Sequence, residues 1–121
     1  MKVLVFGRTG QLATEIARRA QGGVTLDMAG RDRADLETPD ACATLIRETA
    51  PDAVINAAAY TAVDRAEKEE DRATLVNAAA PGAMARACAA LGIPLVHVST
   101  DYVFDGSGTS PWRPEDAPAP L

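Results

Sequence analysis

The two glycines within residues 7–13, GRTGQLA, are spaced as in turns that hold a phosphate group. Gly7 and Gly10 lack side chains, so backbone N–H groups can approach a pyrophosphate there, and the N-terminus of a following helix adds partial positive charge. Ala13 permits a close contact between that helix and the preceding strand. The pattern GxxGxxA directly after an apolar run therefore predicts a phosphate site, although glycine turns also serve as packing devices in βα units.

Charged residues follow the second expected strand, where a dinucleotide-binding fold contacts the adenosine ribose. At that point an acid selects the free 2′-hydroxyl of NADH, whereas an arginine tolerates the 2′-phosphate of NADPH. Residues 29–33 read AGRDR, and Arg31 favours NADPH. Two alternatives to this interpretation stay open. The first is that Arg31 and Arg33 belong to a solvated loop and do not contact the cofactor. The second is that Asp27 or Asp32 is the ligand of the ribose.

Three alanines follow the third expected strand, directly after Asn56. They are too small to fill space, so either a bound cofactor or a tightly packed helix lies against this stretch of backbone. The patterns considered so far give these candidate cofactor contacts: Gly7, Gly10, Arg31, Ala57, Ala58 and Ala59.

Hydroxyl side chains end the fourth expected strand, at Ser99 and Thr100. Ligands of open α/β sheets bind at the carboxyl ends of strands, beside the point where the strand order reverses. A hydroxyl there can donate to a carbonyl oxygen as negative charge develops on it during hydride addition. Without that context, such a pair is a helix cap or a turn. His97, between two valines, is interpreted as a packed, hydrogen-bonded histidine rather than a catalytic base.

Strands and helices must alternate to bring these residues together. Residues 2–6 form an aliphatic run with no polar alternation, which predicts a central strand buried on both faces. Residues 10–20 have apolar positions at helical spacing, and a second helix begins at Thr38-Pro39-Asp40 and ends at Pro51. The remaining expected elements are strands over 24–28, 53–56 and 93–98 and a helix over 64–91 that Pro81 kinks or delays.

The resulting order βαβαβαβ predicts an α/β fold of the Rossmann type. With right-handed crossovers it gives a doubly wound parallel sheet in the strand order 3-2-1-4. The length of 121 residues and an apolar content of 47% suit one domain with one core. This domain is expected to span residues 1–121, with an irregular loop from about residue 103 to residue 121, where Gly, Ser and Pro accumulate.

Composition and charge exclude several function classes. A net charge of −5 and scattered arginines argue against a nucleic-acid partner, and the charged run over residues 64–72 fits a solvated, ion-paired surface. The sequence has no apolar segment approaching the roughly 20 residues that span a bilayer, and its N-terminal apolar run is too short for a signal peptide. Cys42 and Cys88 lack metal-site spacing. We therefore expect a cytoplasmic protein with two buried, reduced thiols, no membrane contact and no metal site.

Five segments together resemble the dTDP-4-dehydrorhamnose reductase family, a branch of the extended short-chain dehydrogenases. They are spread over the whole chain, and the third and last are the most specific. The matching segments are residues 6–12, Asp35-Leu36, residues 56–67 (NAAAYTAVDRAE), Asn77 and residues 99–106 (STDYVFDG).

This resemblance implies an NADPH or NADH site and a dTDP-sugar substrate. The reaction would be hydride transfer to the 4-keto group of dTDP-4-dehydro-L-rhamnose, which gives dTDP-L-rhamnose for cell-envelope polysaccharide. Thr100 would hydrogen-bond the C4 carbonyl and the catalytic tyrosine, and Asp101 and Tyr102 would lie near the sugar nucleotide. The implied cofactor contacts are Gly10, Gln11, Leu12, Asp35, Leu36, Ala59, Tyr60, Thr61 and Val98.

Three features separate the chain from the family pattern. Ala13 stands where the family commonly has glycine, and residues 69–71 lack a frequent proline. The family's proton donor is the tyrosine of a Tyr-x-x-x-Lys pair expected shortly after Leu121, so the substrate-binding half is expected to be absent and this stretch alone inactive. Some members bind magnesium at a subunit contact through a glutamate that would be Glu15 here, and a homodimer is compatible with this.

Two other functions fit the same scaffold. One is a non-catalytic regulatory or binding protein that kept the reductase fold. The other is an epimerase or dehydratase acting on another nucleotide sugar. A Tyr-x-x-x-Lys pair favours an enzyme over the regulatory protein, and the sugar nucleotide that is turned over separates the reductase from the epimerase.

Overall fold

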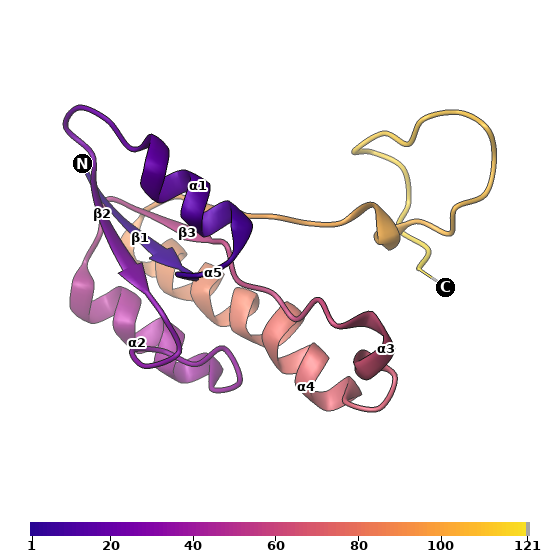
Figure 1. The fold of residues 1–121 in the computed structure, drawn as a ribbon, viewed down its shortest axis with the longest axis horizontal. Coiled ribbons are helices and arrows are strands. Elements are labelled where there is room, and N and C mark those ends of the chain that lie inside the picture. The colour runs from indigo at the N-terminus through magenta and orange to yellow at the C-terminus, as the bar shows by residue number, and fades with distance from the viewer. Residues whose placement is uncertain (121) are drawn as a thin grey trace.

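The computed structural model describes residues 1–120, and its centre is a sheet of parallel strands (Figure 1). The sheet order is β2-β1-β3-β4. The central strand is apolar after its first residue, Lys2, and Val3, Leu4, Val5 and Phe6 are all at most 4% exposed. The bounds are β1 (Lys2–Phe6), β2 (Thr25–Ala29), β3 (Ala53–Asn56) and β4 (Leu95–His97).

The predicted strand order 3-2-1-4 is wrong, whereas the parallel α/β fold itself is confirmed. β3 lies beside β1, with Val5 opposite Ile55 and Phe6 opposite Asn56. After β2 the chain crosses over β1, and β3 then pairs with the edge of β1 that faces away from β2. The strand expected beyond β2 is therefore absent from the described residues. Hydrophobic patterning identifies β1 as buried on both faces, but it does not say which strand occupies either edge.

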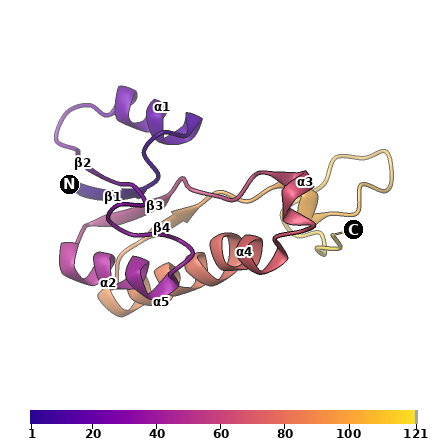
Figure 2. The same ribbon diagram turned by 60° about the horizontal axis from the view of Figure 1, so that its bottom comes forward.

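Helices cover both faces of the sheet, as a doubly wound fold requires (Figure 2). One face carries α1, whose small residue Ala13 is fully buried. The other carries α2 and α5, which pack against one another. The bounds are α1 (Gln11–Arg19), α2 (Pro39–Thr49) and α5 (Ala80–Leu91).

The main core lies between the sheet and the α2–α5 layer. Leu4, Phe6, Ile46 and Met84 are fully buried there, and each such side chain stabilises the fold by about 1.5–3 kcal/mol. Cys42 also lies in this core as a free thiol, as predicted, and burial raises its pKa to about 11.

The expected helix over 64–91 is divided into several elements. After the short helix α3 (Val63–Ala66), the chain turns into α4 (Glu70–Thr74), a π-helical turn η1 (Leu75–Ala79) and then α5. The π-helical turn is closed by the N–H of Ala80, which donates to the carbonyl of Leu75. It lies just before Pro81, which has no N–H and whose ring would clash with the carbonyl four residues earlier. A widened turn therefore accommodates the proline, and the helix continues.

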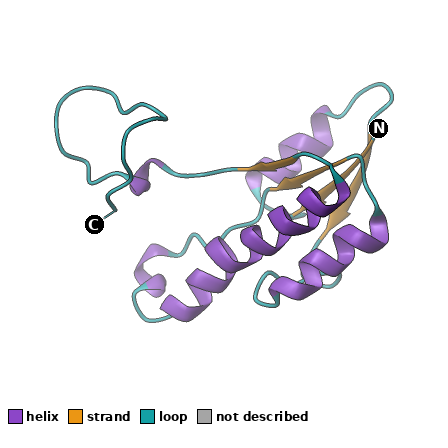
Figure 3. Cartoon of the chain, turned by 180° about the vertical axis from the view of Figure 1, so that it is seen from behind, coloured by secondary structure: helices purple, strands orange, loops and turns teal. Residues whose placement is uncertain are grey.

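Beyond β4 the chain extends away from the sheet (Figures 1 and 3). A short 3-10 helix η2 (Asp101–Val103) is followed by residues 104–120, which form neither helix nor strand. Phe104 stacks on Trp112 with ring centroids 4.6 Å apart. The last residue of the predicted irregular loop, Leu121, lies outside the described residues. Across residues 1–120, each helix is too short or too polar to cross a bilayer.

Candidate cofactor cleft

A cleft of about 740 Å³ lies at the carboxyl ends of β1, β2 and β3. This volume is within the range of small-molecule sites. The position is the point at which the strand order reverses, since the chain leaves β1 toward β2 on one side and β3 leads to β4 on the other. The lining comes from residues 7–11 after β1, residues 29–32 and 34–36 after β2, residues 57–59 and Thr61 after β3, and Val76.

Gly7 forms the floor of the cleft, where two loops meet. Its φ of +109° is unfavourable for any residue with a side chain, and its N–H donates to the carbonyl of Ala29 at 2.9 Å. A Cβ built at this position would lie 3.2 Å from both the carbonyl carbon and the oxygen of Ala57. Only glycine lets the turn after β1 lie this close to the loop after β3.

Gly10 serves a different purpose from Gly7. It is the N-cap of α1, in extended backbone with φ −72°, and a Cβ there would meet no atom within 4 Å. The absence of a side chain therefore leaves space in the cleft, and the first N–H groups of α1 have no helical partner. This is the geometry in which backbone N–H groups hold an anion. The turn therefore fits the pyrophosphate of a dinucleotide.

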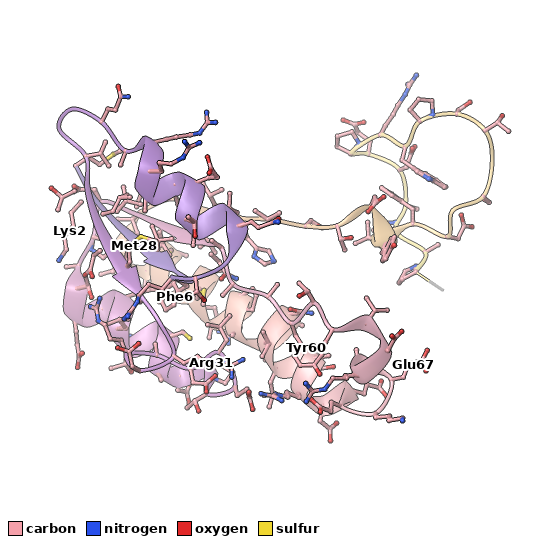
Figure 4. All side chains as sticks on the ribbon, viewed as in Figure 1. Lys2, Phe6, Met28, Arg31, Tyr60 and Glu67 are labelled. Atoms are coloured by element: carbon pink, nitrogen blue, oxygen red, sulfur yellow. The ribbon has the colours of Figure 1, made fainter. Side chains whose placement is uncertain are left out.

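The charged residues after β2 separate into two groups. Arg31 and Asp32 line the cleft, and Arg31 projects from the loop beyond β2 (Figure 4). Asp32 also pairs with Arg8 at 3.6 Å. Arg33 instead donates to Asp27, which lowers the pKa of that carboxyl, and neither residue belongs to the lining. Of the two alternative ribose ligands, only Asp32 is therefore near the cleft.

Asp35 and Leu36 continue the lining on the same side. The Leu36 side chain is 7% exposed and joins the core. One carboxylate oxygen of Asp35 accepts the N–H of Glu37 at 3.0 Å, and its backbone carbonyl accepts the N–H of Thr38 at 2.9 Å. These bonds hold the chain in a tight turn before α2, where Asp35 and Leu36 line the cleft.

The buried side chain of Asn56 supports the loop after β3, which lines the side of the cleft opposite Asp35 and Leu36. It is 1% exposed, and its Oδ1 accepts the N–H of Ala58 at 3.1 Å. Its Nδ2 lies 3.1 Å from His97 Nδ1. The side chain therefore satisfies the backbone of the three-alanine stretch that follows it. His97 is hydrogen-bonded as predicted, but it is exposed rather than packed.

Tyr60 lies between two lining residues, Ala59 and Thr61, but does not line the cleft itself. Its phenol donates to Glu69 at 2.8 Å, beside α4 (Figure 4). The Asn77 side chain accepts the Tyr60 N–H at 2.8 Å and donates to its carbonyl at 2.9 Å. Asn77 belongs to the π-helical turn, which also directs Val76 into the cleft. No sequence pattern pointed to Val76, because the π-helical turn shifts the helical periodicity.

Several predicted site residues do not reach the cleft. Leu12 and Val98 are 41% and 56% exposed and lie outside its lining. Thr100 caps η2, accepting the Tyr102 N–H at 3.2 Å and donating to Asp101 at 3.3 Å. The segment that carries Thr100, Asp101 and Tyr102 follows β4 away from the sheet (Figure 1).

Glu15, the residue to which the resemblance assigns magnesium, lies on α1. Arg18 and Arg19 both donate to its carboxylate, at 2.8 and 3.1 Å, and lower its pKa. Magnesium prefers several oxygen ligands, including carboxylates. Residues 1–120 hold no cluster of three or more His, Cys, Asp or Glu side chains suited to a metal ion. Within the described residues, the Glu15 carboxylate is therefore engaged by arginines and is not grouped with other possible metal ligands.

Comparison with known families gives a match to the RmlD substrate binding domain over residues 1–121. The chain belongs to this family. The resemblance to dTDP-4-dehydrorhamnose reductases is thereby confirmed for the whole sequence. Among its curated relatives, the dTDP-4-dehydrorhamnose reductase of Burkholderia thailandensis is 46% identical over 122 residues, which cover 100% of this chain and 41% of the relative.

Solved structures agree with this membership of the RmlD substrate binding domain family. A dTDP-4-dehydrorhamnose reductase from Clostridium acetobutylicum superposes with a TM-score of 0.93 at 37% identity, covering 99% of this chain and 43% of that one. The reductase from Bacillus anthracis, in complex with NADP, gives 0.91 at 32% identity, covering 98% and 43%. The chain therefore spans about two-fifths of the length of these relatives.

Proposed function

We propose that this chain provides the NADPH-binding part of a dTDP-4-dehydrorhamnose reductase, which reduces dTDP-4-dehydro-L-rhamnose to dTDP-L-rhamnose. The observation that carries the proposal is the cleft at the reversal of strand order, with Gly7 opening its floor and Gly10 leaving the N-terminus of α1 accessible. Relatives that bear the reductase name match the chain over its whole length. The NADP complex of the Bacillus anthracis enzyme supports the choice of cofactor.

Each part of the cleft has a role in this function. The N–H groups of the turn after β1 would bind the pyrophosphate, Arg31 the 2′-phosphate, and Asp35 and Leu36 the region of the adenine. The backbone of residues 57–61 would lie along the cofactor. NADPH, when bound, supplies the hydride for the C4 carbonyl.

The hydroxyl of Thr100 would donate a hydrogen bond to the C4 oxygen of the sugar as negative charge develops there. In the structure the proton of this hydroxyl is directed at Asp101. Binding of the substrate would therefore require the hydroxyl to rotate away from the carboxylate. Asp101 and Tyr102 would lie beside the sugar nucleotide.

The direct test is a spectroscopic assay of the full-length protein with NADPH and dTDP-4-dehydro-L-rhamnose. We expect loss of the absorbance of the reduced nicotinamide and formation of dTDP-L-rhamnose. An unchanged absorbance together with epimerisation or dehydration of another nucleotide sugar would overturn the proposal in favour of that activity. Failure to turn over any nucleotide sugar while NADPH binds would favour a regulatory protein.

The cofactor preference depends on Arg31 and gives a separate prediction. Arg31→Asp should weaken NADPH binding about tenfold or more, because a charge-assisted contact to the 2′-phosphate is worth about 1.5–3 kcal/mol. NADH, which lacks this phosphate, should be affected much less. Titration calorimetry with both cofactors measures the difference.

The matched control is Arg47→Asp, which makes the same change of charge on an exposed position of α2, outside the cleft lining. It should leave both affinities unchanged. Equal weakening of NADPH and NADH by Arg31→Asp would mean that Arg31 does not contact the 2′-phosphate.

A further inference from the structure

Arg72 of α4 is bonded to both sides of the cofactor cleft. On one side its Nε donates to Glu37 Oε1 at 2.8 Å, and its Nη2 forms an ion pair with the same carboxylate oxygen at 2.7 Å. Glu37 directly follows Asp35 and Leu36, which line the cleft after β2. This contact joins residues 35 positions apart in the sequence. It anchors the first lip of the cleft, residues 34–37, to α4.

The same guanidinium reaches the opposite lip through Glu69. Its Nη1 donates to Glu69 Oε2 at 3.1 Å, and that oxygen also accepts the phenol of Tyr60 at 2.8 Å. The guanidinium carbon of Arg72 lies 5.6 Å from the centre of the Tyr60 ring. Tyr60 belongs to residues 57–61, which form the second lip of the cleft. The Asn77 side chain bonds both the N–H and the carbonyl of Tyr60.

The positive charge of Arg72 lies between two carboxylates, those of Glu37 and Glu69, and compensates their negative charge. Glu37 and Glu69 are both acidic and only about one-third exposed, and Arg72 lies between them with 32% of its side chain exposed. The Tyr60 hydroxyl, Arg65 and Arg72 together lower the pKa of Glu69 to about 2, so this carboxylate is ionised at neutral pH. Without the guanidinium, the link between the lips would be lost and two carboxylates would face each other without their shared cation.

We propose that Arg72 is a positioning residue that sets the separation of the two lips of the cofactor cleft, without touching the cofactor itself. The inference rests on the proposed function, because it assigns NADPH to this cleft. Arg72 does not belong to the lining, so its influence would pass through Glu37 on one side and through Glu69 and Tyr60 on the other. On the first lip, the residue that it holds, Glu37, directly follows Asp35 and Leu36, near which we propose that the adenine lies.

The test compares Arg72→Met with Arg72→Lys in the full-length protein. Methionine keeps an apolar stem and removes the charge, so the KM for NADPH should rise about three- to tenfold with kcat unchanged, as for loss of a charge network worth about 1 kcal/mol. Arg72→Lys should bind NADPH more tightly than Arg72→Met but less tightly than the wild type. Lysine keeps the positive charge, but its single ammonium group does not reproduce the simultaneous contacts of the guanidinium with Glu37 and Glu69. Binding of 2′,5′-ADP, the adenosine half of the cofactor, should weaken by a similar factor.

Arg65→Met is the matched control. Arg65 also donates to Glu69, at 2.9 Å, but it lies on the same side of the cleft as Tyr60 and does not reach Glu37. Its replacement should leave the KM for NADPH unchanged. Glu37→Gln should reproduce much of the effect of Arg72→Met, and the double variant should be no worse than the stronger single one.

Each outcome bears on one proposal. Wild-type affinity for NADPH in Arg72→Met, or equal loss in Arg65→Met, would overturn the positioning role while leaving the proposed function intact. An additive double variant would also overturn it, because Arg72 and Glu37 would then act independently. Lack of NADPH binding by the wild-type protein would instead overturn the proposed function. Urea unfolding of every variant shows whether affinity changes without a matching change in stability.

Discussion

Replacing Gly7 by alanine should lower the free energy of unfolding by about 3 kcal/mol. The backbone φ of +109° costs of order 1–3 kcal/mol for a residue with a side chain. The new methyl group would also lie 3.2 Å from the carbonyl of Ala57, which is backbone of the neighbouring loop and cannot rotate away. The two loops would have to separate, and NADPH binding should be lost with them. Urea unfolding followed by far-ultraviolet circular dichroism measures the change in stability.

Gly10→Ala is the informative companion, since the two glycines differ in geometry. At Gly10 the backbone is extended and a Cβ meets no atom within 4 Å. Its replacement should cost about 1 kcal/mol or less, as for a poorer N-cap. The added methyl group would nevertheless lie where the pyrophosphate is expected, so NADPH affinity should fall while the fold persists.

The pair separates a structural glycine from a binding one. If Gly7→Ala were as stable as the wild type, the close approach of the two loops would not matter to the fold. If Gly10→Ala bound NADPH with unchanged affinity, the pyrophosphate would not lie at this turn.

Asn56→Ala should lower the free energy of unfolding by about 2–4 kcal/mol. Asn56 is 1% exposed and pairs with the N–H of Ala58 and with His97. Its removal leaves the partly buried N–H of Ala58 without its partner and opens a cavity at the end of β3, and the two costs add. Residues 57–59 lose their internal support, so NADPH affinity should fall as well. The same unfolding assay and cofactor titration apply.

His97→Ala provides the control for this prediction. It removes the other member of the Asn56–His97 pair, but His97 is exposed and water can take its place. We expect a cost of about 1 kcal/mol or less and little change in NADPH affinity. A cost for Asn56→Ala no larger than that for His97→Ala would show that Asn56 does not support the loop after β3.

Much of the fold could be predicted because its elements have local causes. The apolar run of residues 2–6 became β1, and Ala13, expected to contact the preceding strand closely, is buried in α1. Both thiols were expected to be buried, and both are. The bounds of β4 were overestimated, since regular pairing with β3 covers only Leu95–His97. Edge strands such as this one are specified by a neighbour on one side only.

Only part of the candidate site was predicted from the sequence. Its glycine turn, Arg31, Asp35, Leu36 and the three alanines all line one cleft. Tyr60 does not, because its phenol is turned toward Glu69. Sequence motifs mark the position of a residue along the chain, and the direction of its side chain depends on partners elsewhere.

The sequence by itself determined that strands alternate with helices, that β1 is central, and that Gly7 and Gly10 follow it in a phosphate-binding spacing. These features depend on burial and backbone freedom, which neighbouring residues specify. Only the tertiary structure decided that β3 rather than β4 lies beside β1, and therefore that Gly7 lies against Ala57. It also decided that Arg72 joins the two lips of the cleft. The physical reason is that strand edges and ion pairs between distant segments depend on the path of the chain across the sheet, which no local pattern records.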